Sequence, residues 1–406
     1  MLFNSFPFIL GFLPPTLAGY WLLRNHDAAR LWFLLGASLV FYAYWDWRFA
    51  PLLMASIVVN WLAAEMFFRM RHRGFLLAAI VVDLLCLALF KYLGFFAEIA
   101  AETTGWRGEV LHLALPLGIS FFTFHHIIYL ADLLRGRAPR YSFRDYALYI
   151  ALFPQILAGP LVRHSELVFQ FALRPMRDGW ERRLAQGIAL FLIGLGKKIF
   201  IADALAATAD PIFARSAVPG LSVGDAWSAA LAFPFQIYFD FYLYIPLGGN
   251  RHGLPRQVMA LLCTMVLGGL WHGAGWTFVI WGALHGLGLA MGVLWRRWLP
   301  SMPAPLGWAL LMLFLLGSWV LFRSPSLAAA GHIFAAMAGE GAAGPVQGLR
   351  TLVIASALAF LGPTSQSVVE RIKPYPWLAP VAALATLLAF LQLGNGPAYE
   401  FIYFRF

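Results

Sequence analysis

The sequence predicts an all-α membrane protein that crosses the bilayer many times. Of its 406 residues, 61% are hydrophobic and only 12% are charged, whereas a soluble domain has roughly twice that charged fraction. The mean hydropathy is +0.73, and apolar runs recur from end to end. We therefore predict roughly ten transmembrane helices plus re-entrant segments around an intramembrane tunnel. They would form a single integral-membrane domain over residues 1–406.

Ten apolar runs are the predicted transmembrane helices, because each reaches or approaches the length that a helix needs to cross the hydrocarbon core. They are residues 3–23, 31–46, 51–68, 75–97, 117–133, 184–203, 225–246, 305–322, 350–368 and 376–394. The first run has no Lys or Arg before it and no small-residue cleavage pattern after it. We expect it to be a retained span and not a signal peptide.

Arginines gather at the ends of these runs and predict the orientation of the chain. If successive runs cross in alternate directions, the groups within 69–73, 135–144 and 174–183 all fall on one side. We expect that side to be the cytoplasm, with both termini outside. The formal net charge of +10 then reflects orientation and contact with anionic membrane lipid, and it does not indicate nucleic-acid binding.

Two stretches break the alternation, residues 145–173 and 257–295. Each begins and ends beside basic residues of the same predicted side, so each is expected to be a hairpin or a re-entrant segment. Irregular backbone at membrane depth is tolerated only where protein buries it or where it lines a water-filled cavity. The two stretches therefore indicate an internal cavity or tunnel.

The second of these stretches contains GGLWHGAGWTFVIWGALHG, residues 268–286, with two histidines in apolar surroundings. His272 follows Trp271 and lies among glycines, which let backbone or a ligand approach closely. Burial favours the neutral imidazole, which can act as a general base, and intramembrane ionisable residues are functional candidates. His272 is therefore the candidate catalytic residue. The alternative for either histidine is hydrogen-bonded packing between helices, and we prefer it for His285.

No metal site is predicted. In one continuous helix His272 and His285 would be ~20 Å apart and on different faces, and the chain has no H-E-x-x-H motif. Its two cysteines, Cys86 and Cys263, lie in apolar runs without metal-ligand spacing.

Other polar residues in apolar runs are candidates to support substrate binding or to line the tunnel. Gln236 and Asp240 are four residues apart, on one face of a predicted helix, and His126 lies within LPLGISFFTFHHIIYLADLLRG. Trp271 and His285 complete this supporting set. Hydrogen bonding between helices is the alternative explanation for such residues.

Six segments of the sequence, in this order, carry a family resemblance. They are LPLGISFFTFHHIIYLADLLRGRAP, ALFPQILAGPLVRHSEL, FQIYFDF, YLYIPLGGNRHG, GGLWHGAGWTFVIWGALHG and EFIYFRF. Together they resemble the membrane-bound O-acyltransferases, in particular the bacterial branch that O-acetylates alginate and related exopolysaccharides. The resemblance extends from near residue 40 to the C-terminus.

The resemblance implies a function for the predicted tunnel. The histidine of Trp-His-Gly is the essential one in that family, which corresponds to His272. The donor would be acetyl-CoA or another acetyl thioester from the cytoplasm, with no bound cofactor. The acetyl group would pass across the membrane to a periplasmic acetyltransferase or to the polysaccharide. The expected location is the bacterial inner membrane.

The chain departs from the family pattern at one place. In the family, FQIYFDF is followed by further membrane sequence with a second Trp-His segment, whereas here Phe241 runs directly into Tyr242. Trp-His occurs once in the chain, at 271–272. An internal segment is therefore expected to be missing, together with one residue of the site.

Two other functions compete with acetyl transfer. A transporter or channel would also place polar residues in the membrane, but the sequence shows no inverted repeat. A catalytically impaired relative that acts as a scaffold subunit is the other alternative, and the missing segment favours it.

Overall fold

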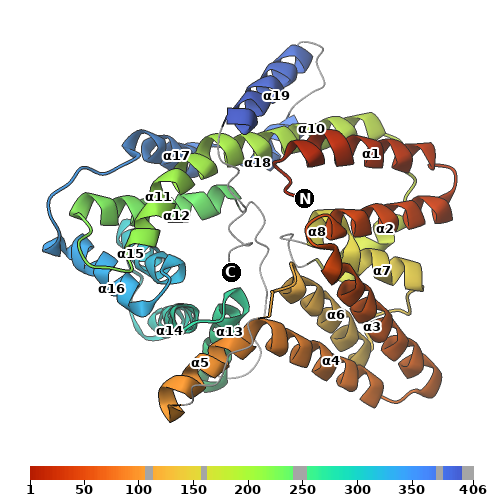
Figure 1. The fold of residues 1–406 in the computed structure, drawn as a ribbon, viewed down its shortest axis with the longest axis horizontal. Coiled ribbons are helices and arrows are strands. Elements are labelled where there is room, and N and C mark those ends of the chain that lie inside the picture. Colours follow the sequence, from red (N-terminus) through yellow and green to blue (C-terminus); the bar gives the residue numbers. More distant parts are fainter. Residues whose placement is uncertain (106–112, 157–161, 241–253, 372–377, 396–406) are drawn as a thin grey trace. The chain divides into compact units, whose positions relative to one another are not determined.

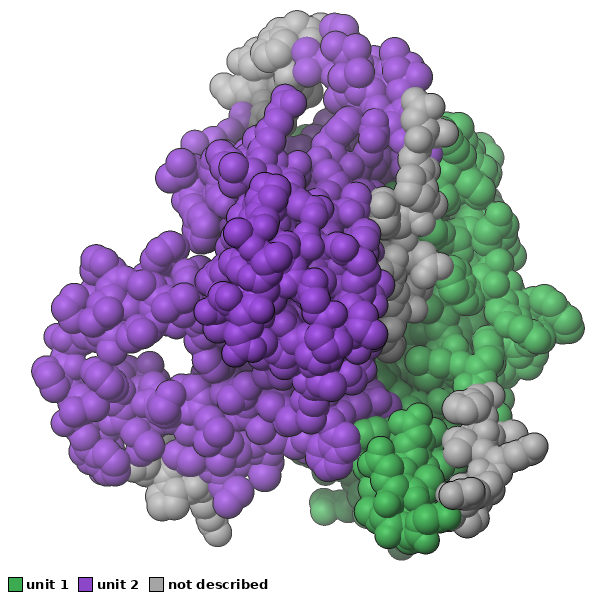
Figure 2. Space-filling model, turned by 60° about the vertical axis from the view of Figure 1, so that its left-hand side comes forward, with its two compact units in different colours: residues 1–183 green, residues 184–406 purple. Residues whose placement is uncertain are grey.

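The computed structural model describes residues 1–105, 113–156, 162–240, 254–371 and 378–395. Every regular element in these ranges is a helix, which confirms the all-α prediction for the described part of the chain (Figure 1). The chain divides into two compact units, residues 1–183 and 184–406, shown in green and purple in Figure 2. The prediction of a single membrane domain stays a prediction.

Unit 1 is built from short and long helices. They are η1 (Pro7–Phe12), α1 (Leu13–Leu22), α2 (Asp27–Ala43), η2 (Trp47–Phe49), α3 (Ala50–Met70), α4 (Gly74–Leu87), η3 (Ala88–Tyr92), α5 (Leu93–Thr104), α6 (Ile119–Leu134), α7 (Phe143–Ala151), α8 (Phe153–Ile156) and α9 (His164–Phe171). Phenylalanine rings fill part of its core: Phe41 lies 5.4 Å from Phe12 and 5.6 Å from Phe153, between ring centroids. These contacts join the first helices to the segment around α8.

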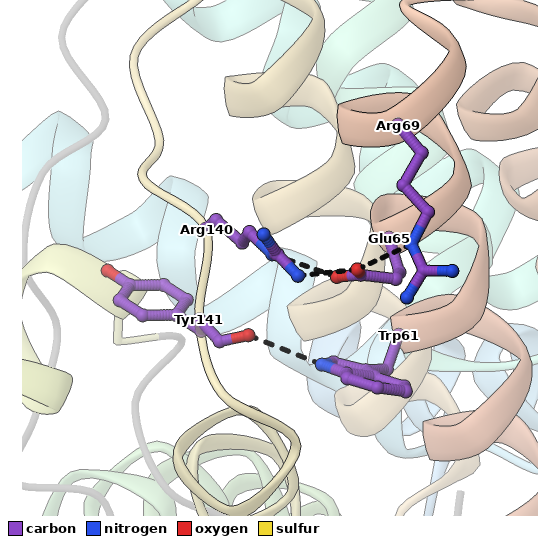
Figure 3. A network of polar contacts seen from close by, with 5 residues as sticks. All are labelled: Trp61, Glu65, Arg69, Arg140 and Tyr141. Atoms are coloured by element: carbon purple, nitrogen blue, oxygen red, sulfur yellow. Dashed lines mark hydrogen bonds and ion pairs between the residues drawn. The ribbon is translucent and has the colours of Figure 1, made fainter.

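A polar network ties the chain before α7 to α3 (Figure 3). The Glu65 carboxylate accepts hydrogen bonds from Arg69 Nε at 3.0 Å and from Arg140 Nε at 2.9 Å and Nη2 at 2.5 Å. One turn earlier, the Trp61 indole N–H donates to the Tyr141 carbonyl at 3.2 Å. Both contacts come from one face of α3, so they hold residues 140–141 against that helix.

Unit 2 contains the remaining helices, the first of which begins just before the unit boundary. They are α10 (Trp180–Lys197), η4 (Lys198–Ala202), α11 (Asp203–Arg215), α12 (Val223–Asp240), α13 (Leu254–His272), α14 (Trp276–Trp298), α15 (Ala304–Arg323), α16 (Leu327–Ala335), η5 (Ala336–Glu340), α17 (Leu349–Leu361), α18 (Ser365–Arg371) and α19 (Leu378–Asn395). Their shared core includes Phe213, Phe233, Val320, Phe322 and Ile333, all buried. An ion pair at 2.9 Å between Arg323 and Asp210 joins the end of α15 to α11.

Four helices are long and apolar enough to cross a membrane, as judged from length and composition in the described residues. They are Trp47–Met70, Gly74–Thr104, Trp276–Trp298 and Ala304–Arg323. Three of them cover the predicted spans 51–68, 75–97 and 305–322. The fourth is α14, which begins within the stretch 257–295, where a hairpin or re-entrant segment was expected, and ends just beyond it at Trp298. The chain is thus a multi-pass membrane protein, but the number of ten spans is not confirmed.

Proline and glycine explain why some predicted spans are not single helices. In the run 3–23 the π-helical turn η1 passes directly into α1, and each has a proline in its first two positions, where a helix tolerates the missing N–H. The run 350–368 is broken into α17 and α18, which are bent by 63° at Gly362 and Pro363. The predicted span 225–246 ends as α12 at Asp240, and its remainder lies outside the described residues.

Candidate functional site

His272 is the last residue of α13 and stands at the tip of a helical hairpin. Residues 273–275 form the turn, and α14 begins at Trp276 after Gly275, whose backbone is extended. The apolar sequence on either side of the turn forms two helices because its only interruption is the Gly-Ala-Gly tripeptide. The stretch predicted as a hairpin or re-entrant segment is therefore a helical hairpin, with a span-length second arm.

Glycines let the two arms of the hairpin pack with their backbones close together. A Cβ at Gly269 of α13 would lie 2.2 Å from the Phe278 carbonyl oxygen, and one at Gly282 of α14 would lie 2.3 Å from the Met265 carbonyl oxygen. Gly286 similarly approaches Leu262. Small residues at helix contacts in membranes commonly serve this close approach. Gly269 therefore allows the backbone of α14 to approach. The sequence predicted that the glycines near His272 would let either backbone or a ligand approach closely.

Aromatic rings surround the His272 imidazole, which is partly buried. Its ring centroid lies 4.7 Å from Trp271, 5.3 Å from Trp281 and 5.2 Å from Phe322. Trp281 and Phe322 meet the imidazole edge to face. The chain therefore holds this imidazole between three large apolar side chains, which restrict both its rotation and its access to water.

His285 extends the same cluster toward α15. Its ring lies 4.5 Å from Trp281 and 5.0 Å from Phe314. The Ser318 hydroxyl donates to the Leu315 carbonyl at 2.9 Å, so its oxygen is free to accept from His285 Nε2 at 3.1 Å. This is a hydrogen bond between α14 and α15, the contact that the packing interpretation of His285 requires.

The other predicted residues lie elsewhere. Gln236 is buried in α12, 3% exposed, and its amide oxygen has no hydrogen-bond partner within the described residues. Asp240 is the last residue of α12, and its side chain lies outside the described part of the chain. The structure brings Trp271, His272 and His285 together around Trp281.

His126 belongs to unit 1, where hydrogen bonds fix its ring on both sides. The Ser56 hydroxyl donates to the Leu53 carbonyl at 2.8 Å, so its oxygen accepts from His126 Nε2–H at 3.2 Å. His126 Nδ1 then accepts from the Tyr146 hydroxyl at 2.5 Å. The imidazole is fully buried and neutral in this arrangement, with one donor and one acceptor nitrogen.

One buried histidine of unit 1, His164, was missed from the sequence. His164, at the start of α9, pairs with Asp132 at 3.3 Å and with the Tyr141 hydroxyl at 2.9 Å. Burial lowers the pKa of His164, and the hydrogen bond to Asp132 opposes this shift. His164 and Asp132 are 32 residues apart in the chain, so no local spacing could have paired them. Among the described residues, no group of three or more His, Cys, Asp or Glu side chains is placed to hold a metal ion.

The comparisons with known proteins identify the family. The family model of membrane-bound O-acyltransferases (MBOAT) matches residues 234–323, from α12 to the end of α15. The peptidoglycan O-acetyltransferase of Helicobacter pylori is 34% identical over 426 residues, covering 84% of this chain and 80% of that protein. A probable alginate O-acetylase of Azotobacter vinelandii is 37% identical, covering 83% and 78%. The chain belongs to the membrane-bound O-acyltransferase family and is an O-acyltransferase.

The lengths of these alignments bear on the expected missing segment. The alignment with a probable alginate O-acetylase of Pseudomonas putida extends over 451 positions at 34% identity and covers 94% of this chain and 91% of that protein. The whole chain has 406 residues, so the relative has residues within the aligned region that have no counterpart here. The expected junction, between Phe241 and Tyr242, lies outside the described residues.

Proposed function

We propose that the chain O-acetylates an extracytoplasmic polysaccharide, with His272 as the catalytic base and an acetyl thioester as donor. Relatives named as alginate O-acetylase and peptidoglycan O-acetyltransferase support the acetyl group and the class of acceptor. We further propose that the donor, acetyl-CoA or a similar thioester, enters from the cytoplasm through a tunnel that the roughly ten membrane helices surround. The protein would lie in the bacterial inner membrane, in contact with lipid and with a periplasmic acetyltransferase or the polymer.

The observation that carries this proposal is the setting of His272 at the hairpin tip. A base for acyl transfer must accept a proton from the attacking hydroxyl, and water must be kept away from the thioester. The aromatic rings of Trp271, Trp281 and Phe322 enclose the imidazole, and this enclosure supports both requirements. His285 bonds to Ser318 of α15, which supports a packing role for that histidine.

The experiment compares two histidine variants of the same hairpin. Positioned general-base catalysis contributes typically ~10²–10⁴-fold, so His272→Ala should reduce acetylation by about this factor. The readout is polymer-bound acetate per unit of membrane-inserted protein, in cells without another transferase. If this chain has no activity of its own, the pair is compared in a version with the internal segment restored.

His285→Ala is the matched control. It removes an interhelical hydrogen bond, worth ~0.6 kcal/mol on average in membranes, so it should lower the amount of folded protein first. Acetate per inserted protein should stay near the unsubstituted value. If His272→Ala kept its acetate per protein while His285→Ala lost it, the two roles would be the reverse of those proposed.

A further inference from the structure

Trp281 is the residue around which the candidate site is arranged. It is 7% exposed and lies one turn before His285 on α14. Its ring centroid lies 5.3 Å from His272 and 5.1 Å from Phe322, with Trp319 at 5.9 Å. His272 comes from α13 and Phe322 from α15, so these two rings hold the indole from two neighbouring helices.

The indole N–H of Trp281 has no acceptor within the described residues, although the nitrogen is fully shielded from solvent. A buried donor without an acceptor costs free energy, because the hydrogen bond it made to water is lost. Buried tryptophans therefore usually find an acceptor, and in this protein even the half-buried Trp61 and Trp227 donate to backbone carbonyls. An exception in a native protein calls for an explanation, such as a ligand that supplies the acceptor.

We propose that the Trp281 Nε1–H is the donor that binds the carbonyl oxygen of the acetyl group during transfer. This rests on the proposed function, since it places the acetyl group beside His272. The indole packs edge to face against the imidazole at 5.3 Å between ring centroids, so an N–H donor and a proton acceptor belong to neighbouring rings in apolar surroundings. A donor in such surroundings stabilises developing negative charge strongly, because the dielectric is low and the donor is already oriented.

In the proposed reaction the acceptor hydroxyl adds to the thioester and the thiolate leaves. The acceptor hydroxyl oxygen bonds to the thioester carbon while His272 takes the hydroxyl proton, and the carbonyl electron pair moves to the oxygen that Trp281 holds. When that pair returns, the bond between carbon and sulfur breaks and the thiolate leaves. His272 then gives its proton to the thiolate, so an ester and a thiol are formed and the imidazole is neutral again.

The test removes the N–H and keeps the ring. Replacing Trp281 with 3-benzothienylalanine preserves the shape of the indole and puts sulfur in place of N–H, while Trp281→Phe is the simpler variant. Loss of one oxyanion donor typically lowers kcat ~10²–10³-fold. We expect this loss in both variants, with KM little changed and normal membrane insertion for the benzothienyl protein.

Trp319→Phe is the matched control, because Trp319 belongs to the same ring cluster and packs 5.1 Å from Phe322. It should alter stability without reducing kcat. If the benzothienyl protein turned over as fast as the unsubstituted protein, the N–H would have no part in the reaction, and the proposal would be overturned.

A second measurement does not depend on turnover. Acetonyl-CoA, a ketone analogue that cannot transfer its acetyl group, should move the ¹⁵N-indole signal that disappears in Trp281→Phe, and it should leave the Trp319 signal in place. Binding of acetonyl-CoA without this shift contradicts the role of Trp281 and leaves the proposed function intact. If the chain neither bound the analogue nor acetylated a polymer, the proposed function and the role of Trp281 would fall together.

Discussion

Glu65 illustrates how one buried side chain can organise a loop at the end of a helix. Its side chain is 7% exposed, while those of its partners Arg69 and Arg140 are 74% and 59% exposed. Salt bridges to such exposed arginines are individually weak, and salt screens them. Here, however, two arginines share one carboxylate, and residues 140–141 depend on that contact and on Trp61 for their position (Figure 3).

We expect Glu65→Gln to lower the melting temperature of the detergent-solubilised protein, and to lower it less at high salt than at low salt. The change removes the charge but keeps the shape, and charge-assisted hydrogen bonds are about twice as strong as neutral ones. Glu102→Gln, at an exposed position of α5, should have no measurable effect at either salt concentration. Equal melting curves for Glu65→Gln and Glu102→Gln would show that the network does not stabilise the fold.

At this scale the sequence revealed residue types but not partners. His272, Trp271 and His285 could be selected because polar and aromatic residues in one apolar run are conspicuous. Trp281 lies in the same quoted run, yet nothing in its local pattern distinguished it from a lipid-facing tryptophan. His164 pairs with Asp132, which is 32 residues away in the chain, and local spacing does not reveal such a partner.

At the scale of elements, the hairpin of α13 and α14 depends on Gly269 and Gly282, where the backbones of the two helices meet. Gly268 is next to Gly269 on α13 but lies away from this contact, so the two residues offer a matched comparison. A Cβ at Gly269 would collide with the Phe278 carbonyl oxygen at 2.2 Å, whereas one at Gly268 would meet nothing within 4 Å.

We therefore expect Gly269→Ala to separate the two arms, and to reduce both the amount of folded protein and its activity. The backbone of α14 cannot move aside as a flexible side chain would. Gly268→Ala should be neutral or slightly stabilising, because alanine favours helix by about 1 kcal/mol over glycine. Thermal stability of the two variants is the measurement. Equal destabilisation of both would mean that the contact at Gly269 does not limit helix packing.

Helix type was predictable from the sequence, but helix length was less so. Long apolar runs such as 51–68 and 305–322 became span-length helices, even though the second contains Gly307 and Gly317. The run 350–368 was broken where glycine and proline are adjacent, at Gly362 and Pro363, and the π-helical turns η1, η3 and η4 have no distinctive sequence pattern. The hairpin at 257–295 was expected from charge alternation, yet only the structure shows that its second arm is long enough to cross.

At the scale of the whole molecule, the expected missing segment makes a direct prediction about activity. Inserting the segment that is expected between Phe241 and Tyr242 should raise acetylation above that of this chain, because the expected second Trp-His pair would complete the site. Polymer-bound acetate per inserted protein is the measurement, and His272→Ala in the restored chain should remove the gain. If this chain alone acetylated the polymer fully, the segment would be dispensable.

The predicted orientation is tested by labelling. Single cysteines at Arg137 and Arg296, in a background without Cys86 and Cys263, should react with a membrane-impermeant reagent only after the inner membrane is opened. The reason is that arginine-rich ends remain on the cytoplasmic side. Labelling of either position from the periplasm of intact cells would contradict the orientation with both termini outside.

The hairpin of α13 and α14 also bears on how the chain enters the bilayer. The apolar part of α13, Val258–His272, is shorter than the 18 residues that α14 and the other span-length helices exceed, and a spanning helix needs ~20 apolar residues. Alone, α13 is a poor substrate for the translocon. Its Gly269 packs directly against the backbone of α14, so we expect α13 to insert together with α14, once that helix has been synthesised. His272 would thus reach its final position only after the ribosome has synthesised α14, the helix that carries Trp281.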